Sequence, residues 1–374
     1  MEEFDIAIVG GGMAGASAGY FMAERSRVLL LEMEAQPGYH TTGRSAALYS
    51  EAYGNAAIRA LTSGGRAFYE APPAGFAEHP LLTPRGALFI GRDDQQAALD
   101  ATAAEASANV DSIRRLDAAA TRALVPVLRE DYVGGGVHEP DAMDIDVNAL
   151  HQGFLRGLRA RGGDVRVDAE VTGLQRDADA WRIESRGGTV RAAVLVNAAG
   201  AWCDVVAGMA GVAPIGLVPK RRTAILFAPP QDAGSDGWPL CVDVDETFYF
   251  KPDAGKLMGS PADETPLDPC DVQPDELDIA LAVDRIETAT TMQIRRIEHR
   301  WAGLRSFVAD KTPVVGFDAA VDGFFWLAGQ GGYGIQTAPS MGRVSAALVA
   351  GQDIPGDLQD FGVAAAALSP SRLR

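Results

Sequence analysis

The stretch FDIAIVGGGMAGASAG, residues 4–19, decides the fold of this chain. An apolar run ends in a cluster of glycines, and an alanine-rich segment with the small residues of a tightly packed helix follows. The next apolar run, SRVLLLE at residues 26–32, has the length of a strand. This order predicts a strand, a glycine turn, a helix and a second strand, which is the first βαβ unit of a parallel sheet.

The glycines of this turn have the spacing GxGxxG, with Gly10, Gly12 and Gly15 between the predicted strand and helix. Glycine keeps such a turn tight, lets backbone approach a pyrophosphate and lets the helix pack on the strand. Glu32, at the end of the second strand, is placed to accept ribose hydroxyls and disfavours a 2′-phosphate there. The alternative is a glycine-rich turn without a ligand. The strand, helix and acid together favour an adenine dinucleotide.

Further pieces of the same pattern recur along the chain. Residues 148–163 form a predicted helix with Leu150, Phe154 and Leu158 on one face, and 164–171 form a predicted strand. Residues 180–185 and 189–200 read as strands joined by a turn, and the strand 323–329 precedes a predicted helix at 340–351. Long stretches without this pattern separate the pieces. We therefore predict an α/β protein with a Rossmann-type domain that is discontinuous in sequence (1–79, 141–212 and 312–374) and a substrate domain at 80–140 and 213–311.

The composition limits the class of partner. The chain has 374 residues, of which 47% are hydrophobic, and a formal net charge of −17. This length and apolar content allow one large core or two linked cores. The negative charge argues against nucleic acid and against anionic lipid, because both bind basic surfaces. We expect a folded protein that acts on a small molecule.

Metal-ligand and targeting patterns are not recognisable. The first residues are acidic where a signal peptide is basic, and no apolar run reaches the roughly 18 residues of a membrane span. The cysteines form no CxxC pair and the histidines show no HxxxH or HExxH spacing. We expect no metal, no membrane span and a cytoplasmic location. The residues concerned are Cys203, Cys241, Cys270, His40, His79, His138, His151 and His299; His151 is the histidine expected to be packed.

Two more small-residue segments distinguish between nucleotide cofactors. VLVNAAGAW (194–202) is an apolar strand that ends in small residues, and QGGYGIQTAPSMG (330–342) is a second glycine-rich turn before a helix. NAD needs only one such turn, whereas the longer FAD can use both ends of the sheet. The segments therefore favour FAD.

Taken in order, these motifs resemble the FAD-dependent D-amino-acid oxidase and dehydrogenase family. The matching segments are GGGMAG with Glu32, TTGRSAA (41–47), NAAGAWCD (197–204), WAGLRSF (301–307) and QGGYGIQT (330–337). The similarity covers essentially the whole chain and is close to bacterial D-arginine dehydrogenases. The resemblance implies noncovalent FAD and an α+β substrate domain whose antiparallel sheet roofs the flavin. It also implies oxidation of an amine carbon by hydride transfer.

The resemblance places a large set of residues at the cofactor. The helix expected just after Gly334 would point its N-terminus at the reduced flavin ring, where negative charge develops. The full set is Gly10, Gly12, Met13, Ala14, Gly15, Glu32, Met33, Thr42, Gly43, Arg44, Ser45, Ala46, Val171, Ala199, Gly200, Trp202, Gly331, Gly332, Tyr333, Gly334, Ile335 and Gln336.

An amino-acid substrate presents a carboxylate, which the planar guanidinium of arginine matches best. Arg305 lies in the apolar setting WAGLRSF, and Arg222 precedes a predicted strand. The alternatives are a structural ion pair for Arg305 and a solvated basic cluster for Arg222. The family motifs favour a carboxylate clamp in which Tyr249 and Tyr53 also act. Gly303 and Gly332 would offer backbone carbonyls to the substrate amine.

The segment 48–54 resembles a movable lid in the family, and we expect Tyr53 to close the carboxylate side. The predicted substrate pocket consists of Leu48, Ser50, Glu51, Ala87 and Asp243. Leu48 stands where D-arginine dehydrogenases carry a histidine, and Ala87 where they carry an acid that pairs with the guanidinium. A buried guanidinium without an acid is disfavoured by several kcal/mol, so we expect neutral, apolar D-amino acids as substrates. Glu51 or Asp243 could substitute as the acid, which would restore a preference for basic substrates.

The predicted reaction is oxidative deamination of a D-amino acid by α-hydride transfer to flavin N5, followed by hydrolysis of the imino acid to a 2-oxo acid and ammonia. Two alternatives remain open at this point. One is oxidation of glycine or an N-methyl amine such as sarcosine. The other is a flavin-carrying subunit without a substrate of its own. The electron acceptor is not predicted.

Overall fold

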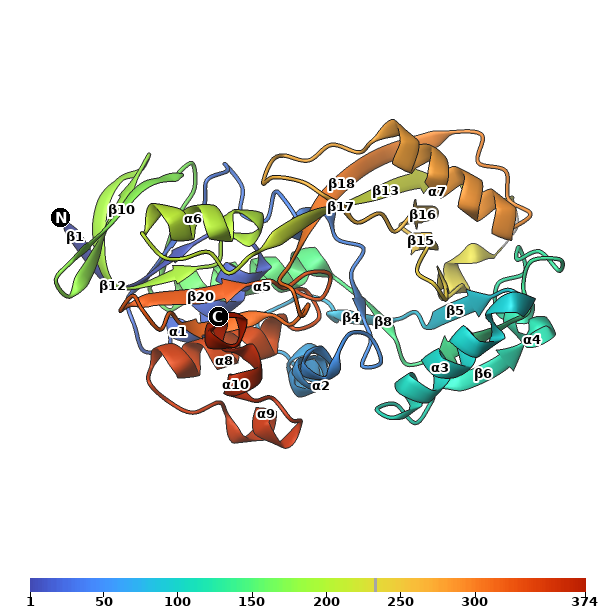
Figure 1. Cartoon of the computed structure of the whole chain (residues 1–374), viewed down its shortest axis with the longest axis horizontal. Coiled ribbons are helices and arrows are strands. Elements are labelled where there is room, and N and C mark those ends of the chain that lie inside the picture. Colours follow the sequence, from blue (N-terminus) through green and yellow to red (C-terminus); the bar gives the residue numbers. More distant parts are fainter. Residues whose placement is uncertain (232–233) are drawn as a thin grey trace.

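The structure is a computed structural model that describes residues 1–231 and 234–374. Figure 1 shows two halves side by side. One half contains both termini and a sheet flanked by helices. The other contains a second sheet, whose long strands β13 and β18 reach back to the first half.

The predicted βαβ unit is present at the centre of the first sheet. β1 (Glu2–Val9) leads into α1 (Met13–Met22), and β2 (Val28–Leu31) lies parallel to β1. On its other side β1 pairs in parallel with β12, with Val9 opposite Asn197. The carboxyl ends of these strands therefore meet at one edge of the sheet, where open α/β sheets bind ligands.

The rest of the first sheet extends in both directions from this unit. Its main order is β10-β11-β12-β1-β2-β9, and β20 lies parallel to β12 and antiparallel to β19. The additional strands are β9 (Asp164–Arg166), β10 (Val171–Asp177), β11 (Ala180–Ser185), β12 (Gly188–Asn197), β19 (Val314–Phe317) and β20 (Phe324–Ala328).

Helices α1, α5 (Val147–Ala160) and α8 (Ala338–Val349) pack on one face of this sheet. The predicted face of α5 is confirmed, since Leu150, Phe154 and Leu158 are fully buried. α6 (Cys203–Met209) packs on the opposite face. Because both faces are covered, the central strands read as nearly continuous apolar runs.

The second sheet is mainly antiparallel and forms the core of the other half. Its main order is β17-β13-β16-β15-β14-β5-β7-β6, with β18 paired to β13. One face packs on α7 (Glu276–Ala289). Phe250 of β15 and Ile286 of α7 belong to the apolar cluster between them. The strands are β5 (Ala87–Gly91), β6 (Arg114–Asp117), β7 (Gly135–Glu139), β13 (Val218–Phe227), β14 (Leu240–Asp243), β15 (Tyr249–Asp253), β16 (Lys256–Ser260), β17 (Thr265–Pro266) and β18 (Ile297–Phe307).

A small sheet of β3 (Leu48–Tyr49), β8 (Met143–Ile145) and β4 (Leu82–Pro84) connects the halves. The remaining helices are α2 (Ala56–Glu70), α3 (Gln96–Ser107), α4 (Ala118–Leu124), α9 (Gly356–Asp360) and α10 (Ala365–Leu368).

The structure corrects two sequence-based boundaries. Residues 164–171 were expected to be one strand but divide between β9 and β10. Asp168 has φ +50°, and the amides of residues 168 and 169 donate to the carbonyls of Glu34 and Glu32 instead of continuing the ladder. The helix expected just after Gly334 begins at Ala338, because turns occupy 331–337 and Pro339 fits the first helical turn, where no amide donor is needed.

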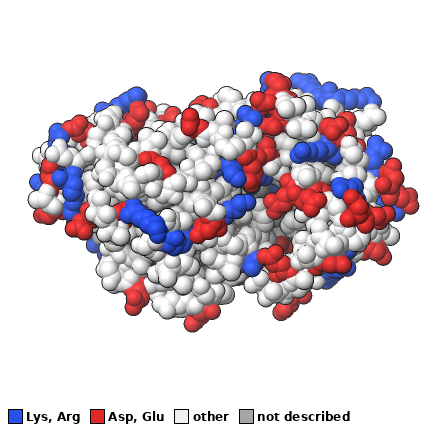
Figure 2. All heavy atoms as spheres, viewed as in Figure 1, with Lys and Arg blue, Asp and Glu red and all other residues white. Residues whose placement is uncertain are grey.

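The strands of the first sheet come from residues 2–31, 164–197 and 314–328, and those of the second from 87–139 and 218–307. We retain as a proposal the domain boundaries 1–79, 141–212 and 312–374 against 80–140 and 213–311. Figure 2 shows Asp and Glu interspersed with Lys and Arg over the visible face, so the negative charge there is not gathered in one patch. Among the described residues no helix has the length and apolar character needed to cross a membrane.

Candidate active site

One cavity is lined both by the β1–α1 turn and by residues of β13, β15 and β18 in the second sheet. Both sheets contribute to its wall, so two sets of residues that are far apart in sequence face each other across it. The predicted residues that line it are Gly10, Gly12, Met13, Ala14, Glu32, Met33, Thr42, Arg44, Ser45, Ala46, Val171, Ala199, Gly200, Trp202, Arg222, Tyr249, Gly303, Arg305, Gly331, Gly332, Gly334 and Ile335.

The glycines at the β1–α1 turn have different local roles. Gly10 has φ +106°, and a Cβ there would overlap the carbonyl oxygen of Ala198. A Cβ on Gly15 would overlap the Gly10 carbonyl, so helix and turn touch at this point. A Cβ on Gly12 meets only the Thr42 hydroxyl, at 3.4 Å. The backbone beside Gly12 is therefore open to the cavity, as the approach of a pyrophosphate requires, and the Met13 amide at the start of α1 donates to the Thr42 hydroxyl at 2.9 Å.

Glu32 ends β2 and lines the cavity next to this turn. Its two carboxylate oxygens accept hydrogen bonds from the amides of Gly11, at 2.8 Å, and Glu34, at 2.9 Å. Burial raises the pKa of Glu32, although the two amide bonds oppose the shift. His151 is packed as expected, with Nε2 2.8 Å from the Gly11 carbonyl oxygen. The acid is thus held rigidly at the position predicted for ribose recognition.

At the other end of the cavity, two buried polar atoms have no partner in the described part of the chain. They are Gln330 Nε2 and Ser306 Oγ, and both residues line the cavity. Gly331 follows Gln330 in the sequence and has φ +54°. Its amide donates a hydrogen bond to the Ser306 carbonyl. Unpartnered polar groups at this end, and a glycine cradle at the other, fit an elongated cofactor with a polar ring system such as FAD.

Arg44 connects the short turn at residues 42–44 to β18. Its guanidinium donates to the carbonyls of Val272 and Ala302, at 3.0 and 3.1 Å, and pairs with Asp271. Trp301 Nε1 donates back to the Arg44 carbonyl at 3.1 Å. Arg44 was predicted to bind the cofactor. Arg44 lines the cavity, and the contacts of its guanidinium with the second half of the molecule position Ser45 and Ala46 along the cavity wall.

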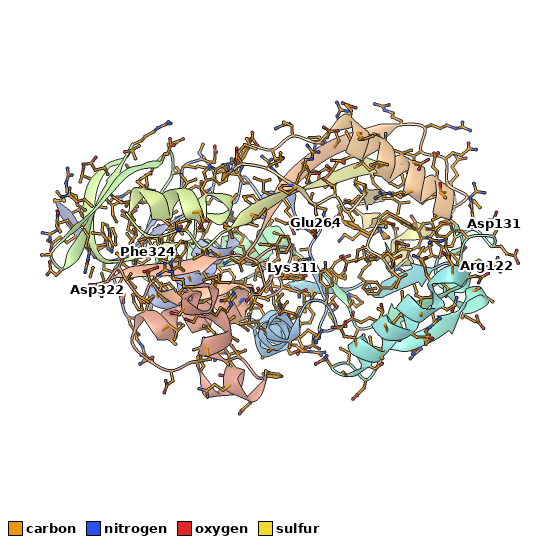
Figure 3. The ribbon with its side chains drawn as sticks, viewed as in Figure 1. Arg122, Asp131, Glu264, Lys311, Asp322 and Phe324 are labelled. Carbon is orange, nitrogen blue, oxygen red and sulfur yellow. The ribbon has the colours of Figure 1, made fainter. Side chains whose placement is uncertain are left out.

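Arg222 and Arg305 lie on one face of the second sheet. Arg222 of β13 is opposite Gly303 of β18, and Arg305 is two residues further along β18. The two arginines are therefore diagonal neighbours, whose backbones are about 7–8 Å apart. Arg222 donates to the Asp263 carbonyl at 2.9 Å and is 3.3 Å from a carboxylate oxygen of Glu264, which Figure 3 labels near the junction. Burial and the charge of Arg305 lower the pKa of Arg222.

Arg305 differs from Arg222 because it has no hydrogen-bond acceptor and no ion pair among the described residues. Its guanidinium lines the cavity, where a second cation is its neighbour. A guanidinium in this setting is stabilised by an anionic ligand. The two arginines therefore form a candidate carboxylate site.

Tyrosines surround the arginines. Tyr249 of β15 lines the cavity, and the rings of Tyr53 and Tyr333 are 5.0 Å apart. Burial raises the pKa of both Tyr53 and Tyr333, and the charges of Arg305 and Arg222 act on Tyr53. The hydroxyls of Tyr53 and Tyr333 are therefore neutral near pH 7. Tyr53 is not among the residues that line the cavity.

The five residues predicted for the substrate side chain are not in the cavity wall. The Ser50 hydroxyl donates to Glu139 at 2.7 Å, and Glu51 pairs with Arg66 of α2 at 2.9 Å. Asp243 is fully buried and accepts from the Thr247 hydroxyl at 2.8 Å, so it stabilises the β14–β15 turn.

Leu48 and Ala87 each have an acidic residue opposite them in their sheets. Leu48 pairs with Asp144, whose carboxylate contacts Lys251 and Arg85, both at 2.6 Å. Ala87 is buried and pairs with Glu139. The surroundings of these two apolar residues are therefore more polar than their identities indicated.

Four predicted cofactor residues are also absent from the cavity wall: Gly15, Gly43, Tyr333 and Gln336. Gly15 supports the turn from behind, and Gln336 donates to the Thr62 hydroxyl at 3.0 Å. Four residues that were not predicted also line the cavity: His40, Leu304, Ser306 and Gln330. His40 directly precedes a recognised motif and the other three lie within one, which is the signal that could have identified them.

Comparisons with known proteins agree with this geometry. The sequence profile of the DAO family, described as FAD dependent oxidoreductase, matches residues 5–348. The chain belongs to this family. It is accordingly an FAD-dependent oxidoreductase, and the residues at both ends of the cavity fit that cofactor.

Relatives of this DAO family member include an uncharacterised oxidoreductase and glycine oxidases. The chain is 26% identical to the uncharacterized oxidoreductase YurR of Bacillus subtilis (strain 168), over 96% of this chain and 98% of the relative. It is 23% identical to glycine oxidase of Bacillus licheniformis, over 94% and 95%. Glycine oxidase from Geobacillus kaustophilus has the same fold, with a TM-score of 0.84, 21% identity and coverage of 97% and 99%. The narrower similarity to D-arginine dehydrogenases stays a prediction.

Proposed function

We propose that this DAO family member oxidises the α-carbon of a D-amino acid. The observation that carries the proposal is Arg305, whose guanidinium lines the cavity beside Arg222 without an acceptor among the described residues. An amino acid brings the missing anion in its carboxylate. Bidentate contact with a guanidinium also fixes the orientation of the α-carbon, which proximity-based catalysis requires.

The roles of the individual residues follow from their positions. Arg305 and Arg222 hold the carboxylate, and the hydroxyls of Tyr249 and Tyr53 donate to it. The carbonyls of Gly303 and Gly332 accept hydrogen bonds from the amine and orient it. FAD, when bound, accepts the α-hydride at N5. The imino acid that leaves the protein is hydrolysed to a 2-oxo acid and ammonia.

We propose neutral, apolar D-amino acids as the substrate class. Leu48 and Ala87, which the family resemblance assigns to the side-chain pocket, carry no charge, although neither lines the cavity. The nearby acids Glu51 and Asp144 each have a cationic partner, and Asp243 is bound within its own turn. Glu51 and Asp144 cannot receive a guanidinium without losing contacts that they already make. Asp243 Oδ1 has no hydrogen-bond partner among the described residues, but Asp243 is not in the cavity wall.

Oxidation of glycine or sarcosine is a second candidate, and one observation favours it. None of the five side-chain pocket residues lines the cavity, so the space beside the arginines suits a small substrate. Two of the similar proteins are glycine oxidases. A flavin-carrying subunit without a substrate would have no use for the unpaired Arg305, which argues against that alternative.

Anaerobic reduction of the bound flavin distinguishes these functions. The purified holoprotein is mixed with D-methionine, D-leucine, D-phenylalanine, D-arginine, their L-enantiomers, glycine or sarcosine, and the flavin absorbance is followed. Fast bleaching by the neutral D-amino acids supports the proposal, and faster bleaching by glycine or sarcosine supports the second candidate. Bleaching by none of them contradicts both. Repeating the active reaction with oxygen identifies whether oxygen or another acceptor reoxidises the flavin. We also propose a cytoplasmic location.

A further inference from the structure

Residues 50–54, here called the tyrosine segment, join β3 to α2 and carry Tyr53, on which the charges of Arg305 and Arg222 act. On one side the segment is held to α2, because Glu51 pairs with Arg66 at 2.9 Å. On the other side its Ser50 hydroxyl donates a hydrogen bond to Glu139, at the end of β7 in the second sheet. Neither sequence motif nor the proposed function assigns a role to Glu139.

Glu139 is positioned by the register of the second sheet. Tyr249 is opposite Val242, Val242 is opposite Phe89, and Phe89 is opposite Val137. Opposite residues share a face, and residues two apart on a strand share it too. Glu139 therefore lies on the face that carries Tyr249, directed toward the first half of the molecule.

The carboxylate of Glu139 contacts the tyrosine segment directly. It accepts a hydrogen bond from the Ser50 hydroxyl at 2.7 Å, and the backbone amides of Glu51 and Ala52 lower its pKa. Glu139 is only 3% exposed, and no cation pairs with it among the described residues. These polar neighbours all belong to the segment that immediately precedes Tyr53.

We propose that Glu139 is a positioning residue whose carboxylate holds the tyrosine segment against the second sheet and thereby places the Tyr53 hydroxyl beside Arg305 and Arg222. The inference rests on the proposed carboxylate site, because it assigns the purpose of the contact to that site. Glu139 itself does not touch the substrate.

The contact depends on the charge of Glu139, because an ionised carboxylate accepts a hydrogen bond more strongly than a protonated one. Burial raises the pKa of Glu139 to about 7. The charged group that acts on it from the segment is Glu51, which also raises the pKa. His138 is on the opposite face of β7, and the nearby Asp144 is neutralised by Lys251 and Arg85. Positioning of Tyr53 is therefore expected to weaken as the pH falls below about 7.

The test measures binding of benzoate, a carboxylate without an amine, to the holoprotein by the change in flavin absorbance between pH 6 and pH 9. In Glu139→Gln we expect the benzoate Kd at pH 8 to rise about tenfold, the effect of losing one or two hydrogen bonds, with FAD content unchanged. The wild-type Kd should rise as the pH falls through about 7, and the variant should not show this titration. Ser50→Ala, which removes one donor and leaves the acid in place, should give a smaller increase.

A double-mutant cycle with Tyr53→Phe tests whether Glu139 acts through Tyr53. If it does, Glu139→Gln adds little to the effect of Tyr53→Phe. Additive effects, an unchanged Kd and pH profile, or a loss confined to D-arginine and D-lysine as substrates would overturn the proposal. Asp318→Asn is the control: this buried carboxylate directly follows β19 of the first sheet, is bonded to Trp326 and paired with Arg374, and its replacement should not alter the Kd.

Hydrogen exchange of a peptide that covers residues 50–54 separates this inference from the proposed function. Glu139→Gln should increase exchange in this peptide at pH 8 without any ligand present. If benzoate fails to bind wild type, the carboxylate site is wrong, yet the exchange result still decides whether Glu139 holds the segment. Unchanged exchange in Glu139→Gln would refute the contact itself.

Discussion

Arg305 and Glu139 are both ionisable residues without an oppositely charged partner among the described residues. They differ in whether they can lose their charge. An arginine keeps its charge under nearly all conditions, so a buried guanidinium without an ion pair favours an anionic ligand. A glutamate can instead bind a proton, and the pKa of Glu139 rises to about 7. The first residue therefore indicates an anionic substrate, and the second indicates sensitivity to pH.

Replacing either clamp arginine should reduce kcat/KM strongly. For Arg305→Met and Arg222→Met we expect a loss of at least about 2 kcal/mol, or roughly thirtyfold, because truncating one partner of a buried charged contact costs about 2–5 kcal/mol. Stopped-flow flavin reduction at subsaturating substrate measures the effect. Arg305→Lys, which keeps the charge but not the planar fork, should recover only part of it. Wild-type rates in both methionine variants would show that the clamp is misassigned.

Glu139 should also make folding stability depend on pH. Its pKa is about 7 in the folded protein against an ordinary value of 4.5, so the native state binds this proton more tightly than the unfolded state. The stability is complete below about pH 4.5 and is lost as the pH rises through 7. Between pH 5 and pH 8, the unfolding free energy of wild type should therefore fall by up to about 3 kcal/mol more than that of Glu139→Gln. Denaturant unfolding of the apoprotein at several pH values measures this, and parallel curves for the two proteins would contradict it.

At the scale of elements, the β1–α1 turn separates folding from cofactor binding. A Cβ on Gly15 overlaps the Gly10 carbonyl, whereas a Cβ on Gly12 meets only Thr42 and otherwise points to open space. The two glycines belong to the same motif but are required for different reasons. Gly15 is required for the helix to lie against the turn, and Gly12 for a ligand to approach the backbone.

We therefore expect Gly12→Val to fold but to lose FAD, because its side chain occupies the space of the pyrophosphate. Gly15→Ala should instead destabilise the apoprotein, because α1 must move away from the turn. FAD content after purification and the Tm of each apoprotein measure the two effects. A Gly12→Val protein that retains FAD at wild-type affinity would remove the pyrophosphate from this turn.

At the scale of the whole molecule, the cavity lies between two sheets, and residues of both line it from Gly10 to Arg305. A cofactor in this cavity contacts both halves and should stabilise them together. Ligand binding to the native state alone raises stability by about 2.7 kcal/mol at a hundredfold excess over Kd. The FAD content is thus expected to control the thermal stability of the whole chain.

The bound FAD should be released by acid precipitation and recovered in the supernatant, since we predict no covalent attachment. The Tm of the apoprotein should rise when free FAD is added, in proportion to the logarithm of its concentration above Kd. Absorbance of the supernatant and a thermal scan at several FAD concentrations measure these outcomes. Colour that remains in the acid pellet would show a covalent link.

The sequence by itself determined the elements whose signals are local. The β1–α1–β2 unit, the apolar face of α5 and the glycine positions of the cofactor turn all follow from periodicity and backbone geometry over short distances. The tertiary structure decided which distant side chains meet. Ser50 and Glu139 are 89 residues apart and become partners only through packing of the tyrosine segment against β7. Likewise, only the β13–β18 register places Arg305 diagonally beside Arg222. Such pairings depend on strand register and on how two sheets face each other, which local sequence does not encode, and for that reason the polar surroundings of Leu48 and Ala87 could not be predicted.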